Sequence, residues 1–147
     1  MVCLGNICRS PMAEGILRDK VQSAGLDIET DSAGTANYHV GEMPDERAVA
    51  TMRTKGIDIS DLRGRQFKAE DFAQFDRIFA MDQNNYSDIL ALAANTEDAQ
   101  KVQLMLDRSG GDPRSVPDPY YGGDEGFEEV HRMLDEACEI FLKEIHG

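Results

Sequence analysis

Apolar residues recur every three or four positions in four segments of the chain, a spacing that predicts amphipathic helices. The segments are 11–24, 45–55, 83–93 and 127–145. We expect Ser10 to cap the first helix, Pro11 to be its first residue and Gly25 to end it, because these residue types favour those positions. The chain is therefore predicted to be rich in helices.

Shorter apolar runs between these helices predict strands. Residues 26–30 and 102–106 alternate between apolar and polar positions, and residues 77–81 form a compact apolar run. Residues 107–126 contain many Gly, Pro, Asp and Ser residues and are expected to form a long loop. Because strands alternate with helices, we predict an α/β fold with a parallel sheet covered on both faces, in one domain that spans 1–147.

The first strand is expected to end just before Cys3. Only Met1 and Val2 precede this cysteine, whereas a buried strand usually takes about five residues. We therefore expect the native start to lie upstream of Met1, the alternative being that part of the central strand is missing, and we expect the sequence as given to lose stability around Cys3. Ligands of open α/β sheets bind at the carboxyl ends of the strands, so Cys3 stands where this architecture places chemistry.

An eight-residue segment, Cys3-Leu4-Gly5-Asn6-Ile7-Cys8-Arg9-Ser10, connects that strand to the first helix. A loop that enters a helix presents unpaired N–H groups and a partial positive charge, which suit a phosphate and favour a thiolate. Arg9 adds a planar fork that can bind two phosphate oxygens. Gly5 and Asn6 tolerate the left-handed backbone that a tight anion-binding loop needs. The segment predicts a phosphate site with a nucleophile.

Composition excludes several functional classes. The formal net charge of −13 over 147 residues disfavours nucleic acid as a partner. The sequence contains no run of eighteen apolar residues, which a membrane span would need, and no signal peptide is visible. Three cysteines do not form a secreted disulfide framework, and a nucleophilic cysteine must stay reduced. We therefore expect a cytoplasmic protein without a membrane partner.

Asp118 and the cysteine spacing carry the remaining candidate chemistry. Pro117 and Pro119 restrict the backbone on both sides of Asp118, which suits a positioned catalytic group, although Asp-Pro is also a common turn. Cys3 and Cys8 could form half of a zinc site, but the sequence has no matching Cys or His pair. We therefore predict no metal and no other cofactor.

Cys3 to Ser10 resembles the C-x5-R-[ST] phosphate loop of the low-molecular-weight protein tyrosine phosphatases. Asp118-Pro119-Tyr120-Tyr121 is similar to the general-acid loop of that family, and segments 31–35 and 80–82 and the length also fit. The resemblance covers essentially the whole chain. It implies a three-layer α/β/α fold of Rossmann-like type with a central four-stranded parallel sheet, and hydrolysis of phosphotyrosine monoesters.

The resemblance also assigns roles to residues. Cys3 would be the nucleophile that forms a cysteinyl-phosphate, Arg9 would bind the phosphate, and Asp118 would act as general acid and then as general base. The rest of the loop would bind the phosphate through its backbone N–H groups: Leu4, Gly5, Asn6, Ile7, Cys8 and Ser10.

Further residues receive supporting roles from the resemblance. Tyr38 and Tyr120 would form the aromatic walls of the substrate slot, and Tyr121 would support the loop. The hydroxyl of Ser10 would bond the Cys3 sulfur, as well as acting as a helix cap. Asn6 would hold the loop in place through hydrogen bonds, with Ser32 as a partner behind the loop that does not touch the phosphate.

Three positions near the loop bear on regulation and specificity. Cys8 would form a reversible disulfide that protects Cys3 from over-oxidation, the alternative being a passive loop residue. Ile7 favours phosphotyrosine, since relatives that act on phosphoarginine tend to have threonine there. Leu62 stands where family members often have a histidine that supports the loop asparagine, so we expect an effect on rate or stability.

Three alternatives remain open. An arsenate reductase would need further resolving cysteines, and none lies between Cys8 and Cys138. A phosphoarginine phosphatase would differ only in substrate. A phosphate-binding redox sensor would have no use for a general acid at Asp118. The expected partner is a phosphotyrosine-containing protein or peptide, and the expected state is a monomer, with a weak dimer as the alternative.

Overall fold

The computed structural model describes residues 1–108, 115–120 and 122–146. The elements follow one another along the chain as β1 (Val2–Cys3), α1 (Arg9–Ala24), β2 (Ala33–Gly34), α2 (Glu46–Thr54), α3 (Asp71–Gln74), β3 (Ile78–Ala80), α4 (Gln83–Leu90), α5 (Thr96–Gln100), β4 (Val102–Leu104), the 3₁₀ helix η1 (Met105–Arg108) and α6 (Asp124–His146). No helix in these described ranges is both long and apolar enough to cross a bilayer.

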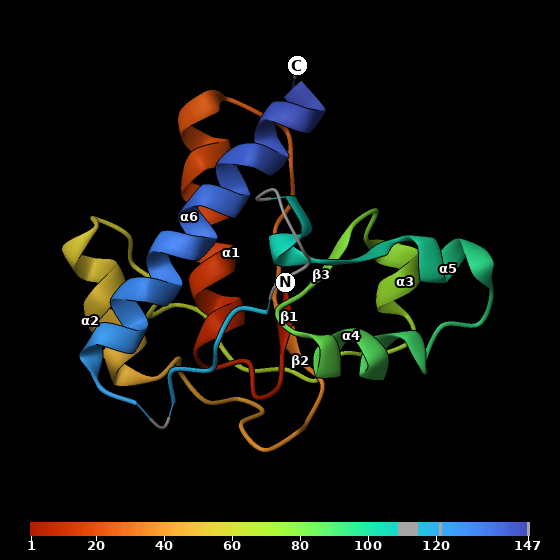
Figure 1. Ribbon diagram of the computed structural model, residues 1–147, viewed down its shortest axis with the longest axis horizontal. Helices are drawn as coiled ribbons and strands as arrows, with labels where there is room; N and C mark the ends of the chain where they lie inside the picture. Colours follow the sequence, from red (N-terminus) through yellow and green to blue (C-terminus); the bar gives the residue numbers. More distant parts are fainter. Residues whose placement is uncertain (109–114, 121, 147) are drawn as a thin grey trace.

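The four strands form one parallel sheet in the order β2-β1-β3-β4. Helices α1, α2 and α6 lie on one side of it, and α3, α4 and α5 lie on the other (Figure 1). The predicted α/β class, the four-stranded parallel sheet and the three-layer arrangement are therefore confirmed. Strand β1 is central, so the loop that follows it begins in the middle of the sheet.

Each face of the sheet has its own hydrophobic core, because successive side chains of a strand point to opposite faces. Cys3 packs with the α1–α6 layer, whereas its neighbour Val2 packs with the α3–α4 layer. The ring of Phe79 meets that of Phe141 edge-on at 5.0 Å on the first face. These two cores hold β1, and with it the start of the phosphate loop, from both sides.

The ends of the first helix differ in part from the prediction. Gly25 ends α1 as predicted, with a left-handed φ of 67°. Ser10 is not the cap, since α1 already begins at Arg9 and Cys8 is the N-cap without a side-chain hydrogen bond. Pro11 is accordingly the third helical residue. The reason is that the Ser10 hydroxyl is engaged by Cys3 and Asn6 and is not free to cap the helix.

Other element boundaries also differ. The predicted strand over 26–30 is wrong: β2 is Ala33–Gly34, because only these residues lie opposite Val2 and Cys3 in the sheet register. Cys3 itself is the last residue of β1 rather than the residue after it. Leu106 belongs to η1, not to a strand. Two short helices, α3 and α5, were not predicted, since four or five residues are too few to show a helical period.

The remaining helices agree more closely. Helix α2 is one residue shorter at each end than the predicted segment 45–55, because Asp45 and Lys55 are its caps. Helix α4 ends at Leu90 instead of residue 93. Helix α6 begins at Asp124, three residues before the predicted segment 127–145, and shortens the expected loop accordingly.

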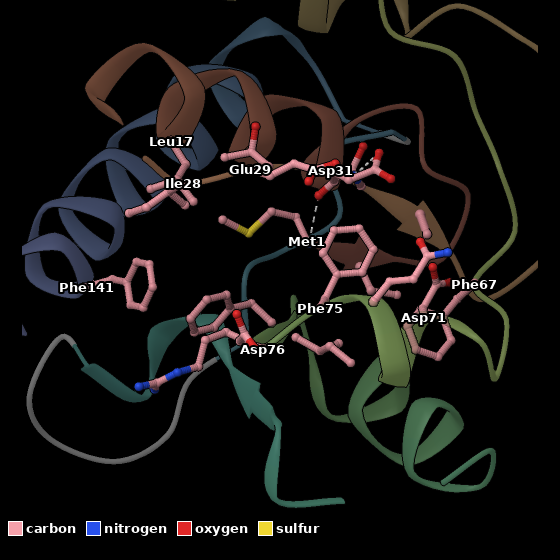
Figure 2. Close-up of a pocket in the computed structure, with 18 of the residues that line it drawn as sticks. Met1, Leu17, Ile28, Glu29, Asp31, Phe67, Asp71, Phe75, Asp76 and Phe141 are labelled. Atoms are coloured by element: carbon pink, nitrogen blue, oxygen red, sulfur yellow. Dashed lines mark hydrogen bonds between the residues drawn. The ribbon is translucent and has the colours of Figure 1, made fainter. Parts of the chain in front are cut away.

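A cavity of about 370 Å³ lies beside Met1, between α1 and α6 on one side and the start of β3 on the other (Figure 2). Leu17, Ile28 and Phe141 line one side of it, and Phe75 lines another. The Met1 amino group donates to Asp31 O at 3.1 Å. Burial lowers the pKa of this amino group, although the nearby carboxylates of Glu14 and Asp31 act to raise it. This cavity is separate from the pocket that holds Cys3.

Gly34 of β2 lies directly against the phosphate loop. A Cβ at this position would stand 2.8 Å from Leu4 O and 3.1 Å from the carbonyl carbon of Gly5. Backbone atoms cannot rotate away as a side chain can, so the loop would have to shift. Glycine at position 34 is therefore required by close packing of two backbones.

We predict that Gly34→Ala lowers the free energy of unfolding by roughly 1–3 kcal/mol, the usual cost of overpacking. Urea unfolding would measure the change. Gly123→Ala is the matched control, because a Cβ there would have no neighbour within 4 Å. Equal unfolding midpoints for the two variants would contradict the close approach of β2 to the loop.

Candidate active site

Asn6 shapes the loop between β1 and α1. Its φ is +58°, the left-handed conformation that the sequence suggested for Gly5 or Asn6. The side-chain amide nitrogen donates to Ser10 Oγ at 2.7 Å and to Ser32 Oγ at 3.0 Å. The side-chain oxygen accepts from Arg65 N at 3.0 Å. The loop conformation is thus fixed by one buried, fully engaged amide.

The Cys3 sulfur lies at the base of this loop and is buried. Ser10 Oγ is 3.1 Å from Cys3 Sγ, and Asn6 N donates to the same sulfur at 3.3 Å. Both groups can donate a hydrogen bond to the sulfur when it is a thiolate. The Ser10 contact is the one that the family resemblance implies.

Ser32 links the loop to a buried carboxyl group. Its hydroxyl accepts from Asn6 and donates to Glu14 Oε1 at 2.7 Å. Burial raises the pKa of Glu14, although the hydrogen bond from Ser32 works in the opposite direction. Sequence reasoning selected Ser32 but missed Glu14 and the backbone of Arg65. Leu62, which the family resemblance places where relatives often have a histidine, packs against the core of the α1–α6 layer.

Arg9 is buried to 3% exposure and its guanidinium is aimed by two other parts of the chain. Nη1 donates to Asp82 Oδ2 at 2.6 Å and to Val116 O at 3.1 Å. Asp82 lies two residues after the last residue of β3 and is also the N-cap of α4. A role for Asp82 was not predicted. The available signal was an acidic residue at the carboxyl end of a buried strand.

Asp118 lies in residues 115–120, here named the acid loop. Its Oδ2 is 3.7 Å from Arg9 Nη2, and its Oδ1 accepts from Tyr120 N at 3.0 Å. The acid loop is attached to the sheet by Val116 N, which donates to Met81 O at 2.7 Å. Arg9 and Asp118, far apart in the sequence, are thus brought together. Tyr121, expected to support this loop, lies outside the described residues.

These groups line one pocket of about 210 Å³. The predicted site residues that line it are Cys3, Leu4, Gly5, Ile7, Cys8, Arg9, Tyr38, Asp118 and Tyr120. Tyr38 is 72% exposed and Tyr120 is 38% exposed, so both stand at the rim. His39, which was not predicted, also lines the pocket, and its ring centroid is 6.5 Å from that of Tyr120. Asn6, Ser10 and Ser32 act from the buried side of the loop.

The other two cysteines differ from Cys3 in their surroundings. Burial raises the pKa of the Cys8 thiol, with the Asp45 carboxylate adding to the effect. Burial raises the pKa of Cys138 on α6 to about 12. All three cysteines are free thiols. Within the described residues, no three His, Cys, Asp or Glu side chains form a metal-binding group.

Comparison with known proteins places the chain in a family. The family model described as "Low molecular weight phosphotyrosine protein phosphatase" matches residues 1–147. A low molecular weight protein-tyrosine-phosphatase of Streptomyces coelicolor is 44% identical over 147 residues, which covers 96% of this chain and 88% of the relative.

Solved structures agree. A protein tyrosine phosphatase of Entamoeba histolytica superposes with a TM-score of 0.92 at 39% identity, covering 99% of this chain and 94% of the other. A Drosophila arginine phosphatase superposes with a TM-score of 0.92 at 35% identity, covering 99% and 96% of the two chains. With a full-length family match and these relatives, the chain belongs to the low molecular weight phosphotyrosine protein phosphatase family.

Proposed function

We propose that this phosphatase hydrolyses phosphotyrosine monoesters through a cysteinyl-phosphate on Cys3. The observation that carries the proposal is the convergence of Cys3, Arg9 and Asp118 on one pocket of about 210 Å³. A nucleophile, a fixed cation and an acid–base group are the three components that phosphoryl transfer through cysteine requires. A module that only bound phosphate would not need Asp118.

In the first step, the Cys3 thiolate attacks phosphorus while the bond from phosphorus to the tyrosine oxygen breaks. The loop N–H groups and the Arg9 guanidinium bind the three equatorial oxygens, where negative charge redistributes. Asp82 and Val116 O hold Arg9 in place for this task. The Asp118 carboxyl donates its proton to the leaving oxygen, so tyrosine departs neutral.

In the second step, water attacks the phosphocysteine. The Asp118 carboxylate takes a proton from the water, and the phosphorus–sulfur bond breaks to return inorganic phosphate and the Cys3 thiolate. Ser10 Oγ and Asn6 N, at 3.1 and 3.3 Å from the sulfur, stabilise that thiolate as it leaves. The protonated form of the Asp118 side chain thus serves the first step, and its carboxylate form serves the second.

The substrate class follows from the rim of the pocket. Tyr38, His39 and Tyr120 surround the entrance, and an aromatic ring can stack among them while its phosphate reaches Cys3. A shorter phosphoserine side chain would not span that depth. Because one structural neighbour is an arginine phosphatase, phosphoarginine is the substrate to compare directly. Ile7 favours phosphotyrosine on the family pattern.

The setting of the reaction is part of the proposal. A phosphotyrosine-containing protein or peptide is the partner, with no nucleic acid, membrane or cofactor involved. The chain would act as one domain and as a monomer, with a weak dimer as the alternative, in the reducing cytoplasm that a Cys3 thiolate needs. After oxidation of Cys3 by a peroxide to a sulfenic acid, the Cys8 sulfur would displace water and form a protective disulfide.

We predict that Cys3→Ser abolishes release of phosphate from phosphotyrosine, because an alkoxide nucleophile is not available at neutral pH. Phosphate release would be measured in the presence of EDTA, which should not affect the unsubstituted chain. Cys138→Ser is the control for loss of a cysteine, because Cys138 is a buried thiol on α6 that does not line the pocket. Turnover by Cys3→Ser, or inhibition by EDTA, would count against the mechanism.

We predict that Asp118→Ala lowers kcat/KM for phenyl phosphate by roughly 10²–10⁴-fold, the usual contribution of a general acid. The loss for 2,4-dinitrophenyl phosphate should be much smaller, because its leaving group departs without a proton. A steady-state comparison of the two esters measures the difference. Equal losses for both would show that Asp118 is not the acid.

A further inference from the structure

The acid loop is held at two points, one on each side of Asp118. On one side, Val116 is bonded to Met81 O and to Arg9. On the other side, Arg47 of α2 donates from Nη2 to Tyr120 O at 2.8 Å and from Nη1 to Gly122 O at 3.0 Å. The place of the Asp118 carboxyl in the pocket therefore depends on an arginine from a separate helix.

The guanidinium of Arg47 is itself fixed. Nε and Nη2 donate to the two carboxylate oxygens of Asp45 at 3.1 and 3.2 Å. Burial disfavours the charged form of Asp45, but hydrogen bonds from Arg47 outweigh it and lower the pKa of this carboxyl. The guanidinium carbon also lies 4.8 Å from the ring centroid of Phe127 and 5.7 Å from that of Tyr120. The side chain is only 35% exposed.

The same turn contacts the phosphate loop. Asp45 N donates to Ile7 O at 2.8 Å, one residue before Cys8 and two before Arg9. Asp45 also caps α2 by accepting from Arg47 N at 2.8 Å. The Asp45–Arg47 pair is thus bonded on one side to the loop that carries the nucleophile and on the other to the loop that carries the acid.

We propose that Arg47 is a positioning residue, which together with Asp45 sets the distance and orientation between Asp118 and Cys3 and places the Tyr120 ring at the rim. The proposal rests on the function proposed above and extends it to residues outside the pocket. Lysine cannot replace this arginine, because the arrangement uses a planar fork of donors that reach three acceptor groups at once.

The first test is Arg47→Lys, assayed with phenyl phosphate and 2,4-dinitrophenyl phosphate. A misplaced acid should lower kcat/KM for phenyl phosphate by roughly 10- to 100-fold, since an error of about 1 Å can cost 10²-fold. The loss for the dinitrophenyl ester, which needs no acid, should be several-fold smaller. Arg53→Lys, an exposed position on the same helix, is the matched control and should equal the unsubstituted chain.

A double-mutant cycle separates positioning from general damage to the fold. If Arg47 acts through Asp118, then Asp118→Ala combined with Arg47→Lys should be no slower on phenyl phosphate than Asp118→Ala alone. Urea unfolding of each variant accompanies the kinetics. Should Arg47→Lys not fold, Asp45→Asn takes its place, because asparagine still caps α2 but no longer pairs with the guanidinium charge.

The outcomes distinguish this inference from the proposed function. Turnover by Cys3→Ser, or an inactive unsubstituted chain, would overturn both. Suppose that Cys3 and Asp118 behave as proposed. The positioning role alone is then wrong if Arg47→Lys lowers kcat/KM equally for the two esters. It is also wrong if the double variant shows the loss of Arg47→Lys in full on top of the loss of Asp118→Ala. The geometry predicts a loss that is several-fold larger for phenyl phosphate than for the dinitrophenyl ester and that vanishes in the Asp118→Ala background.

Discussion

The left-handed turn at Asn6 is the constraint on which the rest of the site depends. A non-glycine residue in this conformation costs roughly 1–2 kcal/mol, which the surroundings must offset. Three hydrogen bonds of its side chain, to Ser10, Ser32 and Arg65 N, do so from the buried side. In return, the backbone N–H of Asn6 faces the Cys3 sulfur at 3.3 Å. Residues that never touch substrate thus fix the anion-binding shape of the loop.

The distribution of charge is consistent with a site that works at short range. The chain carries a formal net charge of −13, so its overall field opposes the approach of an anionic phosphate. Binding must therefore come from groups that are already in place. Arg9 is one such group, buried and held by Asp82 at 2.6 Å, and the loop N–H groups are the others. Because these groups are fixed before binding, the protein reorganises little when negative charge redistributes during phosphoryl transfer.

Local sequence patterns predicted the parts of the structure that local rules govern. The α/β class, the left-handed turn near Gly5 and Asn6, the end of α1 at Gly25 and the place of α2 to within one residue all follow from residue type and spacing. Ser10 was misplaced as a helix cap because its hydroxyl serves the Cys3 sulfur, a contact within the tertiary site. The strand predicted at 26–30 is wrong because the register with Val2 and Cys3 places β2 at Ala33–Gly34.

The supporting residues could not be predicted for the same reason. Asp82, Glu14 and Arg47 act through contacts with Arg9, Ser32 and Tyr120, each distant in sequence. A lone acid after a strand or a lone arginine in a first helical turn is common on any protein surface. What distinguishes these side chains is the partner that each one reaches, and that partner comes only from the fold.

The covalent intermediate is the central claim, and trapping it is the most direct test. Asp118→Ala would be mixed with 2,4-dinitrophenyl phosphate, quenched in acid during turnover and digested for peptide mass spectrometry. The account predicts one added phosphoryl group on the peptide that contains Cys3, and none when Cys3→Ser is introduced. Steady turnover without any phosphorylated peptide, or phosphate on a residue other than Cys3, would contradict it.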